Sequence, residues 1–176
     1  SKGFPYGKLY QWGRKYGQGY SEKYDESVPE IKKETIGLSD GQNANSENIF
    51  FDVQDEPYDW VEPQCDYLWN TGTEDNPLKS EYDPCPAGWR VPTCLELSVL
   101  EQAESFSDMV DEIQGRYFLN ETSESKIFFP SAGYRLVASS ASEIDRGWNG
   151  LYWSSKPSAY LTFNPDDNPI RYQSGA

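Results

Sequence analysis

The chain has 176 residues and a formal net charge of −14, and its aromatic content of 15% is high beside a hydrophobic fraction of 36%. This length suits a single domain with a core built largely from rings, and the sequence has no run of 18 apolar residues that would span a membrane. The acidic balance argues against nucleic acid as a partner, because affinity for nucleic acid rests on clustered Lys and Arg.

The first twenty residues alternate aromatic side chains with glycine. The run Lys8–Gly13 reads as a short buried strand, with Trp12 and either Leu9 or Tyr10 in the core. From about residue 21 to 64 the composition is polar, and we expect mostly ordered loop that packs through Ile49–Phe51 and Tyr58–Trp60.

Oxygen-bearing side chains alternate around one glycine between Ser39 and Glu47. The segment is superficially similar to a calcium loop, but it lacks the spacing that ends in a bidentate Glu. The acidic surface is compatible with calcium or with polar ligands such as glycans, and also with simple solubility. We therefore expect no resident cofactor, with calcium as the open alternative.

The stretch Tyr82–Glu96 combines three prolines, two cysteines, a tryptophan and an arginine directly before a helix start. Thr93 and Glu96 form a capping-box pattern, so a helix is predicted from about Thr93 to Glu104. The stretch reads either as a candidate site or as a proline-stiffened brace that seats this helix, and the brace is the preferred interpretation.

Three cysteines and no histidine exclude the usual zinc patterns. We expect Cys65, Cys85 and Cys94 to be structural, and a single bridge would leave one thiol over. The pairing stays open between a bridge from Cys65 to one of the other two and a bridge to a cysteine outside this chain.

After Glu104 the pattern predicts one short helical turn and then strands. The predicted turn covers Ser107–Ile113, and the predicted strands cover Arg116–Leu119, Ile127–Pro130, Gly133–Val137, Leu151–Ser155, Ala159–Phe163 and the region of Ile170–Tyr172. In the strand at 159–163, Leu161 and Phe163 are expected to be buried while Tyr160 and Thr162 face outward. Early helices and late strands indicate an α+β class with much irregular structure.

Five motifs in order resemble one family. They are Leu9–Lys15, Leu68–Asn70, the run Asp83–Thr93 with Glu96, Phe129-Pro130 with Gly133–Arg135, and Gly150–Ser155. In that order they resemble the major paralogous domain family of bacterial surface proteins, often called FISUMP, over essentially the whole chain. The resemblance implies one C-type lectin-like domain over residues 1–176, loop-rich, with one or two helices, a small antiparallel sheet and the polar segment 21–64 as an insertion.

The calcium-dependent sugar binders of that fold carry a Trp-Asn-Asp triplet and a Glu-Pro-Asn or Gln-Pro-Asp loop. Here Trp148-Asn149 precedes Gly150, and neither loop occurs, so the resemblance does not carry the calcium and sugar mechanism. The fold also serves formylglycine-generating enzymes, whose chemistry needs reactive thiols. Cys85 and Cys94 flank a proline-rich turn without a supporting histidine, so we expect no enzyme.

Residues 133–176 resemble the variable region of proteins diversified by diversity-generating retroelements. That resemblance implies a scaffold beneath a variable binding face, with Trp148 as the first anchor, unless its ring belongs to the core. The candidate ligand-binding residues are Ser139, Ser140, Glu143, Asp145, Arg146, Trp148, Asn149, Leu151, Lys156, Ser158, Tyr160 and Thr162. The expected scaffold residues are Trp12, Trp69, Cys85, Trp89, Arg90, Tyr134, Arg135, Tyr152 and Trp153, with Arg90 and Arg135 as buried or half-buried cations.

The sequence thus predicts a non-enzymatic binding module that recognises a protein or glycan on another cell. Its expected place is extracellular or on a bacterial cell surface or fimbria, with any signal peptide or lipid anchor outside this chain. The competing class is a structural assembly subunit of a pilus or phage tail tip. The sequence leaves the ligand and the oligomeric state undetermined.

Overall fold

A computed structural model describes the chain at residues 6–17, 30–43, 49–53, 55, 58–120, 122–135, 143–166 and 171–174. Within these ranges it has two helices and four small sheets, which confirms the α+β class. The elements are β1 (Glu30–Lys32), α1 (Leu38–Gly41), β2 (Ile49–Phe51), α2 (Cys94–Gln102), β3 (Ser105–Val110), β4 (Ile113–Asn120), β5 (Ser125–Pro130), β6 (Tyr134–Arg135), β7 (Glu143–Ile144), β8 (Gly150–Trp153), β9 (Ala159–Phe163) and β10 (Arg171–Ser174).

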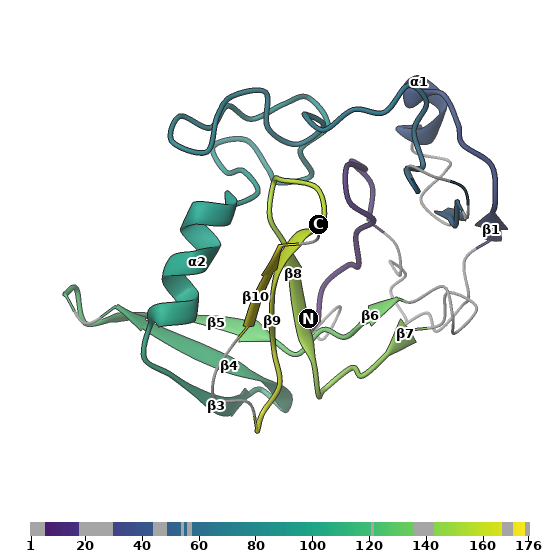
Figure 1. The fold of residues 1–176 in the computed structure, drawn as a ribbon. Helices are drawn as coiled ribbons and strands as arrows, with labels where there is room; N and C mark the ends of the chain where they lie inside the picture. The colour runs from purple at the N-terminus through teal and green to yellow at the C-terminus, as the bar shows by residue number, and fades with distance from the viewer. Residues whose placement is uncertain are drawn as a thin grey trace.

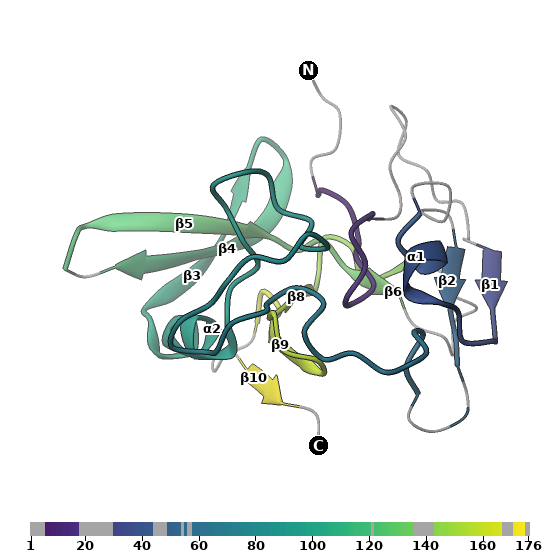
Figure 2. The same cartoon turned by 90° about the horizontal axis from the view of Figure 1, so that it is seen from above.

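The sheets are arranged around two hydrophobic cores. β3–β4–β5 and β8–β9–β10 are antiparallel three-stranded sheets, β6 and β7 form an antiparallel pair, and β1 and β2 form a parallel pair. Figure 1 shows α2 over one end of the β3–β4–β5 sheet, with β8–β10 beside it and the β1, β2 and α1 region on the other side of the molecule. In Figure 2 the N-terminal segment at residues 6–17 lies between these two sides.

The first core joins α2 to two sheets. Leu97 of α2, Phe118 of β4, and Leu161 and Phe163 of β9 are almost fully buried together. In β9 the buried side chains alternate with the half-buried Tyr160 and Thr162, as the alternation in the sequence predicted.

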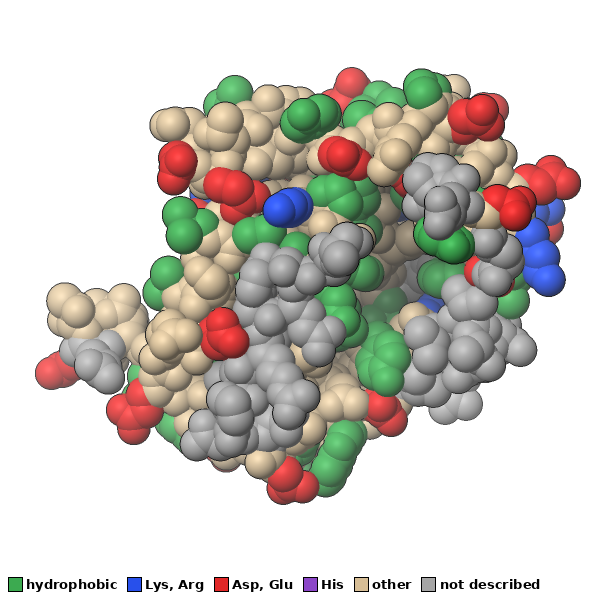
Figure 3. Space-filling view, viewed as in Figure 1, with side chains coloured by type: hydrophobic (Ala, Val, Ile, Leu, Met, Phe, Trp, Pro, Cys, Tyr) green, Lys and Arg blue, Asp and Glu red, His purple; other side chains and the backbone are tan. Residues whose placement is uncertain are grey.

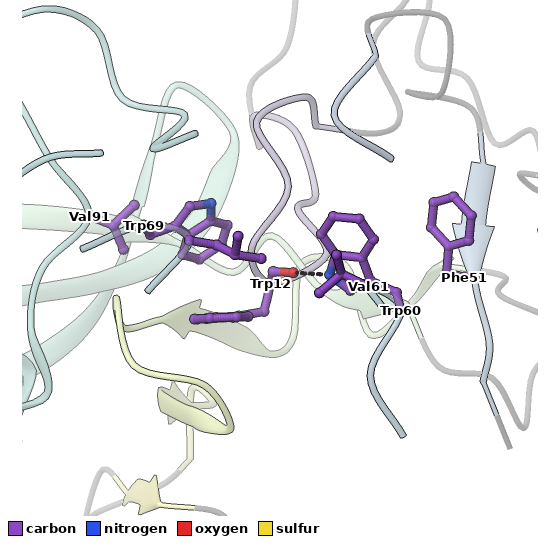
Figure 4. Close-up of a cluster of buried hydrophobic side chains, with 7 residues drawn as sticks. Trp12, Phe51, Trp60, Val61, Trp69 and Val91 are labelled. Carbon is purple, nitrogen blue, oxygen red and sulfur yellow. Dashed lines mark hydrogen bonds between the residues drawn. The ribbon is translucent and has the colours of Figure 1, made fainter. Parts of the chain in front are cut away.

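The second core is built mainly from rings brought together from distant segments. It contains Trp12, Phe51, Trp60, Val61, Leu68, Trp69 and Val91. Figure 4 shows these side chains as a row that runs from Val91 and Trp69 through Trp12 to Trp60 and Phe51. The indole of Trp60 donates a hydrogen bond of 2.9 Å to the carbonyl of Trp12 within this row.

The predicted helix after the proline-rich stretch is confirmed. Thr93 Oγ1 accepts from the Glu96 N–H at 3.2 Å, and Glu96 accepts in return from the Thr93 N–H at 2.9 Å, which is a complete capping box. Arg90 is half-buried, as expected, and donates to both carboxylate oxygens of Glu96, at 2.6 and 2.7 Å. The helix ends at Gln102, two residues before the predicted end.

The helical turn predicted for Ser107–Ile113 is wrong. These residues form the hairpin of β3 and β4, whose two-residue turn at Asp111 and Glu112 has φ angles of 50° and 67°. Two left-handed residues are the geometry that matches the twist of paired strands. The sequence has neither Asn nor Gly at this turn, so the residue pair that usually marks a two-residue hairpin is absent.

The strand predicted for Lys8–Gly13 is also wrong, because within residues 6–17 only an isolated bridge at Leu9 occurs. The side chain of Gln11 makes the hydrogen bonds to Phe51 that the backbone of a neighbouring strand would make. Its amide donates to the Phe51 carbonyl at 2.8 Å and accepts from the Phe51 N–H at 3.2 Å. The expected burial is correct for Trp12, while Tyr10 packs half-buried at the edge of the core.

The segment 21–64 was predicted to be mostly loop, and its described part contains more structure than that. β1, α1 and β2 lie within it, and β1 pairs with β2 in parallel. Phe51 and Trp60 reach the core, as predicted for the two aromatic islands. Of the loop predicted to be similar to a calcium site, residues 44–47 lie outside the described residues.

The scaffold prediction for Trp89, in the proline-rich stretch, needs correction. Trp89 is 72% exposed, because the turn in which its N–H bonds the Pro86 carbonyl, with Gly88 at a φ of 82°, directs the ring outward and Val91 takes the core position. Cys65, Cys85 and Cys94 are all half-buried free thiols, so the bridge from Cys65 to Cys85 or Cys94, one of the two alternatives left open by the sequence, does not occur in the structure. Burial raises the pKa of the Cys85 thiol to about 11, with the nearby Asp83 carboxylate as a second cause.

Candidate functional site

The turn at residues 145–149, called the Trp148 turn below, displays the predicted anchor. Asp145 has a φ of 59°, and its carbonyl accepts from the N–H groups of Trp148 and Asn149 at 2.9 and 2.8 Å. Its carboxylate accepts from the Tyr134 hydroxyl at 3.2 Å and from the Asn149 amide at 2.7 Å. The ring of Trp148 is consequently 49% exposed, so this tryptophan is not a core residue.

The Trp148 turn is tied to the N-terminal segment. The guanidinium of Arg146 lies over the ring of Tyr6, 5.7 Å from its centroid, which is a cation–π distance. Half-burial lowers the pKa of Arg146 to about 10. The Gly147 N–H bonds the Ser131 carbonyl at 2.8 Å, which fixes the other side of the turn.

Next to this turn lies a groove with a volume of about 850 Å³, called the aromatic groove below. Its lining is dominated by tyrosine and tryptophan from segments far apart in the chain: Tyr6, Tyr10, Trp12, Tyr58, Trp60, Trp69, Tyr134, Tyr152, Trp153 and Tyr160. Figure 3 shows a hollow on the face viewed in Figure 1, with hydrophobic side chains within it and around it. The volume lies in the range of small-ligand sites, and rings with few polar groups are their usual lining.

The floor of the aromatic groove is held by indole hydrogen bonds. Trp153 Nε1 donates to the Tyr10 carbonyl at 2.9 Å, and Trp12 Nε1 donates to the Ser154 carbonyl at 3.2 Å. These reciprocal bonds fasten the N-terminal segment to the end of β8. The Tyr152 hydroxyl donates to the Pro130 carbonyl at 2.6 Å, and burial raises the pKa of this hydroxyl well above its usual range.

One side of the aromatic groove carries the rings predicted from the C-terminal strands. Tyr160 of β9 packs edge-to-face on Trp153 of β8, with centroids 5.4 Å apart. Ser158, in the turn between these strands, has a φ of 57° and lines the same side.

Another part of the lining comes from residues 58–66. Tyr58 is 66% exposed with a φ of 61°, an unusual backbone conformation for a bulky residue and one that clusters at functional sites. Asp59, Gln64 and Asp66 add polar groups to this part of the lining. Loss of water on half-burial raises the pKa of Asp59 above its ordinary value, and the charge of Asp66 adds to the rise.

The structure distributes the predicted ligand-binding residues over two neighbouring places. Leu151, Ser158 and Tyr160 line the aromatic groove, and Asp145, Arg146, Trp148 and Asn149 form the turn beside it. Lys156 is exposed and Thr162 half-buried, and both lie outside the lining. Glu143 is placed by its backbone in β7, and Ser139 and Ser140 lie outside the described residues.

Most of the expected scaffold contributes to the same groove. Trp12, Trp69, Cys85, Tyr134, Arg135, Tyr152 and Trp153 all line it. Arg135 is half-buried, as expected.

Several lining residues were missed by the sequence analysis as site residues, above all Tyr6, Tyr10, Tyr58, Asp59 and Asp66. The ring density of the first twenty residues was the available signal, since it exceeds what one buried strand can pack. Tyr58 was grouped with Trp60 as a core island, yet only Trp60 is buried.

Searches of protein-family models, curated proteins and solved structures found no match to the chain. In the part of the chain that the structure describes, no helix is long and apolar enough to cross a membrane. The same part contains no group of three Cys, Asp or Glu side chains placed to hold a metal ion.

Proposed function

We propose that this chain is a non-enzymatic ligand-binding module of a bacterial cell surface or fimbria, which recognises a protein or glycan of another cell. The observation that carries the proposal is the aromatic groove with the exposed Trp148 beside it. Tyrosine and tryptophan supply much of the energy in recognition surfaces, and here they line a concave site. Two of the lining tryptophans donate the hydrogen bonds that join the N-terminal segment to the end of β8.

We further propose a C-type lectin-like fold of the major paralogous domain family, with a retroelement-diversified face at 133–176 as one origin of the ligand surface. The support is the order of the five motifs, together with the places that the described structure gives them. Leu68 and Trp69 are buried, Thr93 caps α2, and the motif at Gly150–Ser155 forms β8 and the residues after it.

An array of glycans and host surface proteins, probed with and without calcium, tests this function. The unaltered chain is expected to capture a ligand, and Tyr160→Ala is expected to weaken capture because it removes one wall of the aromatic groove. Phe106→Ala is the matched control, since Phe106 is an exposed ring on β3 that does not line the groove. Equal capture by both variants would contradict the proposed site, and no capture by the unaltered chain would contradict the function.

A second candidate function, an assembly subunit, is favoured by one observation. Trp89, Leu95 and Val99 are exposed apolar side chains on α2 and just before it, and Figure 3 shows hydrophobic side chains protruding over α2. Sedimentation of the chain over a range of concentrations separates the two candidates. A ligand-binding module stays monomeric, whereas an assembly subunit forms oligomers that Leu95→Ser disrupts.

A further inference from the structure

The aromatic groove has four charged residues in its lining, the cations Lys8 and Arg135 and the carboxylates Asp59 and Asp66. Lys8 and Arg135 each already interact with another group of the protein. Asp59 and Asp66, by contrast, pair with no cation among the residues that the structure describes. The two carboxylates are therefore the groups of this lining with which a cationic group of a ligand can pair.

Asp59 is the more constrained of these two carboxylates. It is half-buried, Oδ1 accepts the Val61 N–H at 3.3 Å, and the backbone N–H of Trp60 also interacts with the carboxylate. A carboxylate that has lost part of its water and faces a second carboxylate gains most from a cation, because the attraction then replaces lost hydration. The same physical causes raise its pKa.

An exposed ring, that of Tyr58, lies beside this acidic part of the lining, whereas the ring of Trp60 is buried against Phe51. Tyr58 and Trp60 flank Asp59 in the sequence, both line the groove, and Tyr58 is largely exposed. Cationic side chains bind the faces of such rings, and the apolar stem of Lys or Arg packs on them at the same time. Guanidinium combines ring stacking with bidentate bonding to a carboxylate.

We propose that the aromatic groove binds a Lys- or Arg-bearing segment of a partner protein, with the cationic group at Asp59 and Asp66 and the rest of the segment on the rings. This inference rests on the proposed ligand-binding function and names its ligand class. The net charge of −14 supports it, because the field of the whole chain attracts basic partners. A neutral glycan would leave both carboxylates unbalanced, and an acidic glycan would be repelled.

The test uses a fluorescent library of octapeptides with blocked ends, in which each Arg position also occurs as Gln and as Glu. Binding to the full chain is measured by polarisation at low and high salt. Peptides with Arg are expected to bind about tenfold more tightly than their Gln versions, and the difference in affinity from the Glu versions should be larger still. The affinity of the Arg peptides should fall at high salt.

Paired charge removals locate the effect. The double variant Asp59→Asn with Asp66→Asn is expected to weaken binding of the Arg peptides about tenfold. The control double variant, Glu112→Gln with Glu124→Gln, removes two exposed charges in the β3–β4 and β4–β5 turns. It should change this affinity by less than about twofold. Asp66→Asn alone serves as the folding-safe variant, because Asp66 is exposed.

Equal binding of Arg and Gln peptides, or equal effects of the two paired removals, would overturn the inference. Capture of a glycan that survives the Asp59 and Asp66 changes but is lost in Tyr160→Ala would also overturn it, while the proposed function would stand. If no peptide and no glycan binds, both this inference and the proposed ligand-binding function are contradicted.

Discussion

Asp145 determines how Trp148 is presented. With a left-handed backbone and both its carbonyl and its carboxylate engaged, it closes the turn that leaves half of the indole exposed. The sequence predicted Trp148 as an anchor from a resemblance and from its residue type. It could not predict that Arg146 reaches back to Tyr6, because a contact across the chain leaves no local pattern.

Trp148→Ala is expected to weaken ligand capture and to change the free energy of unfolding by less than about 1 kcal/mol, because the ring is half exposed and outside both cores. Thermal unfolding and array capture on the same preparation measure the two effects. A fall in the melting temperature as large as that of Leu97→Ala, which removes a buried side chain, would show that Trp148 has a structural role.

At the scale of elements, α2 and β9 were predictable because their signals are local. A capping box and an alternation of buried and half-buried residues are each contained in a few residues. The β3–β4 hairpin was not predictable, since Asp111 and Glu112 adopt turn angles that their residue types rarely signal. The strand prediction for the N-terminal segment was wrong for another reason. There the Gln11 side chain supplies hydrogen bonds that a strand backbone would otherwise make.

The start of α2 should make stability depend on pH. The Arg90 guanidinium lowers the pKa of Glu96 from its ordinary 4.5 to about 2, so the ionised carboxylate is favoured in the folded state. Its stabilising contribution is complete above about 4.5 and is lost as the pH falls through about 2. Urea unfolding of the unaltered chain and of Glu96→Gln should therefore differ most above this range and converge below it. A constant difference at every pH would show that Glu96 acts by packing alone.

Across the whole molecule, indole hydrogen bonds hold together segments that the sequence does not relate. Trp12, Trp60, Trp69 and Trp153 each donate to a backbone carbonyl at least 48 residues away. The richness in rings predicted an aromatic core, and the class α+β followed from the order of elements. Which segments meet, and hence the aromatic groove itself, depends on these long-range bonds.

Trp60→Phe is expected to destabilise the fold by about 1–3 kcal/mol, because it keeps a ring but leaves the buried carbonyl of Trp12 without its donor. Trp89→Phe is the matched control, and we expect a change within about 0.5 kcal/mol because that indole is exposed. Chemical denaturation provides both values. Equal effects of the two substitutions would mean that the indole bonds do not hold the segments together.

The central claim is that ligand occupies the aromatic groove, and the six tryptophans are its reporters. The indole N–H signals of a ¹⁵N-labelled chain are recorded by NMR while the captured ligand is added. Trp153 in the groove and Trp148 beside it should shift and saturate together, whereas Trp89, outside the lining, should stay unchanged. Shifts at Trp89 with none at Trp153 would contradict the account.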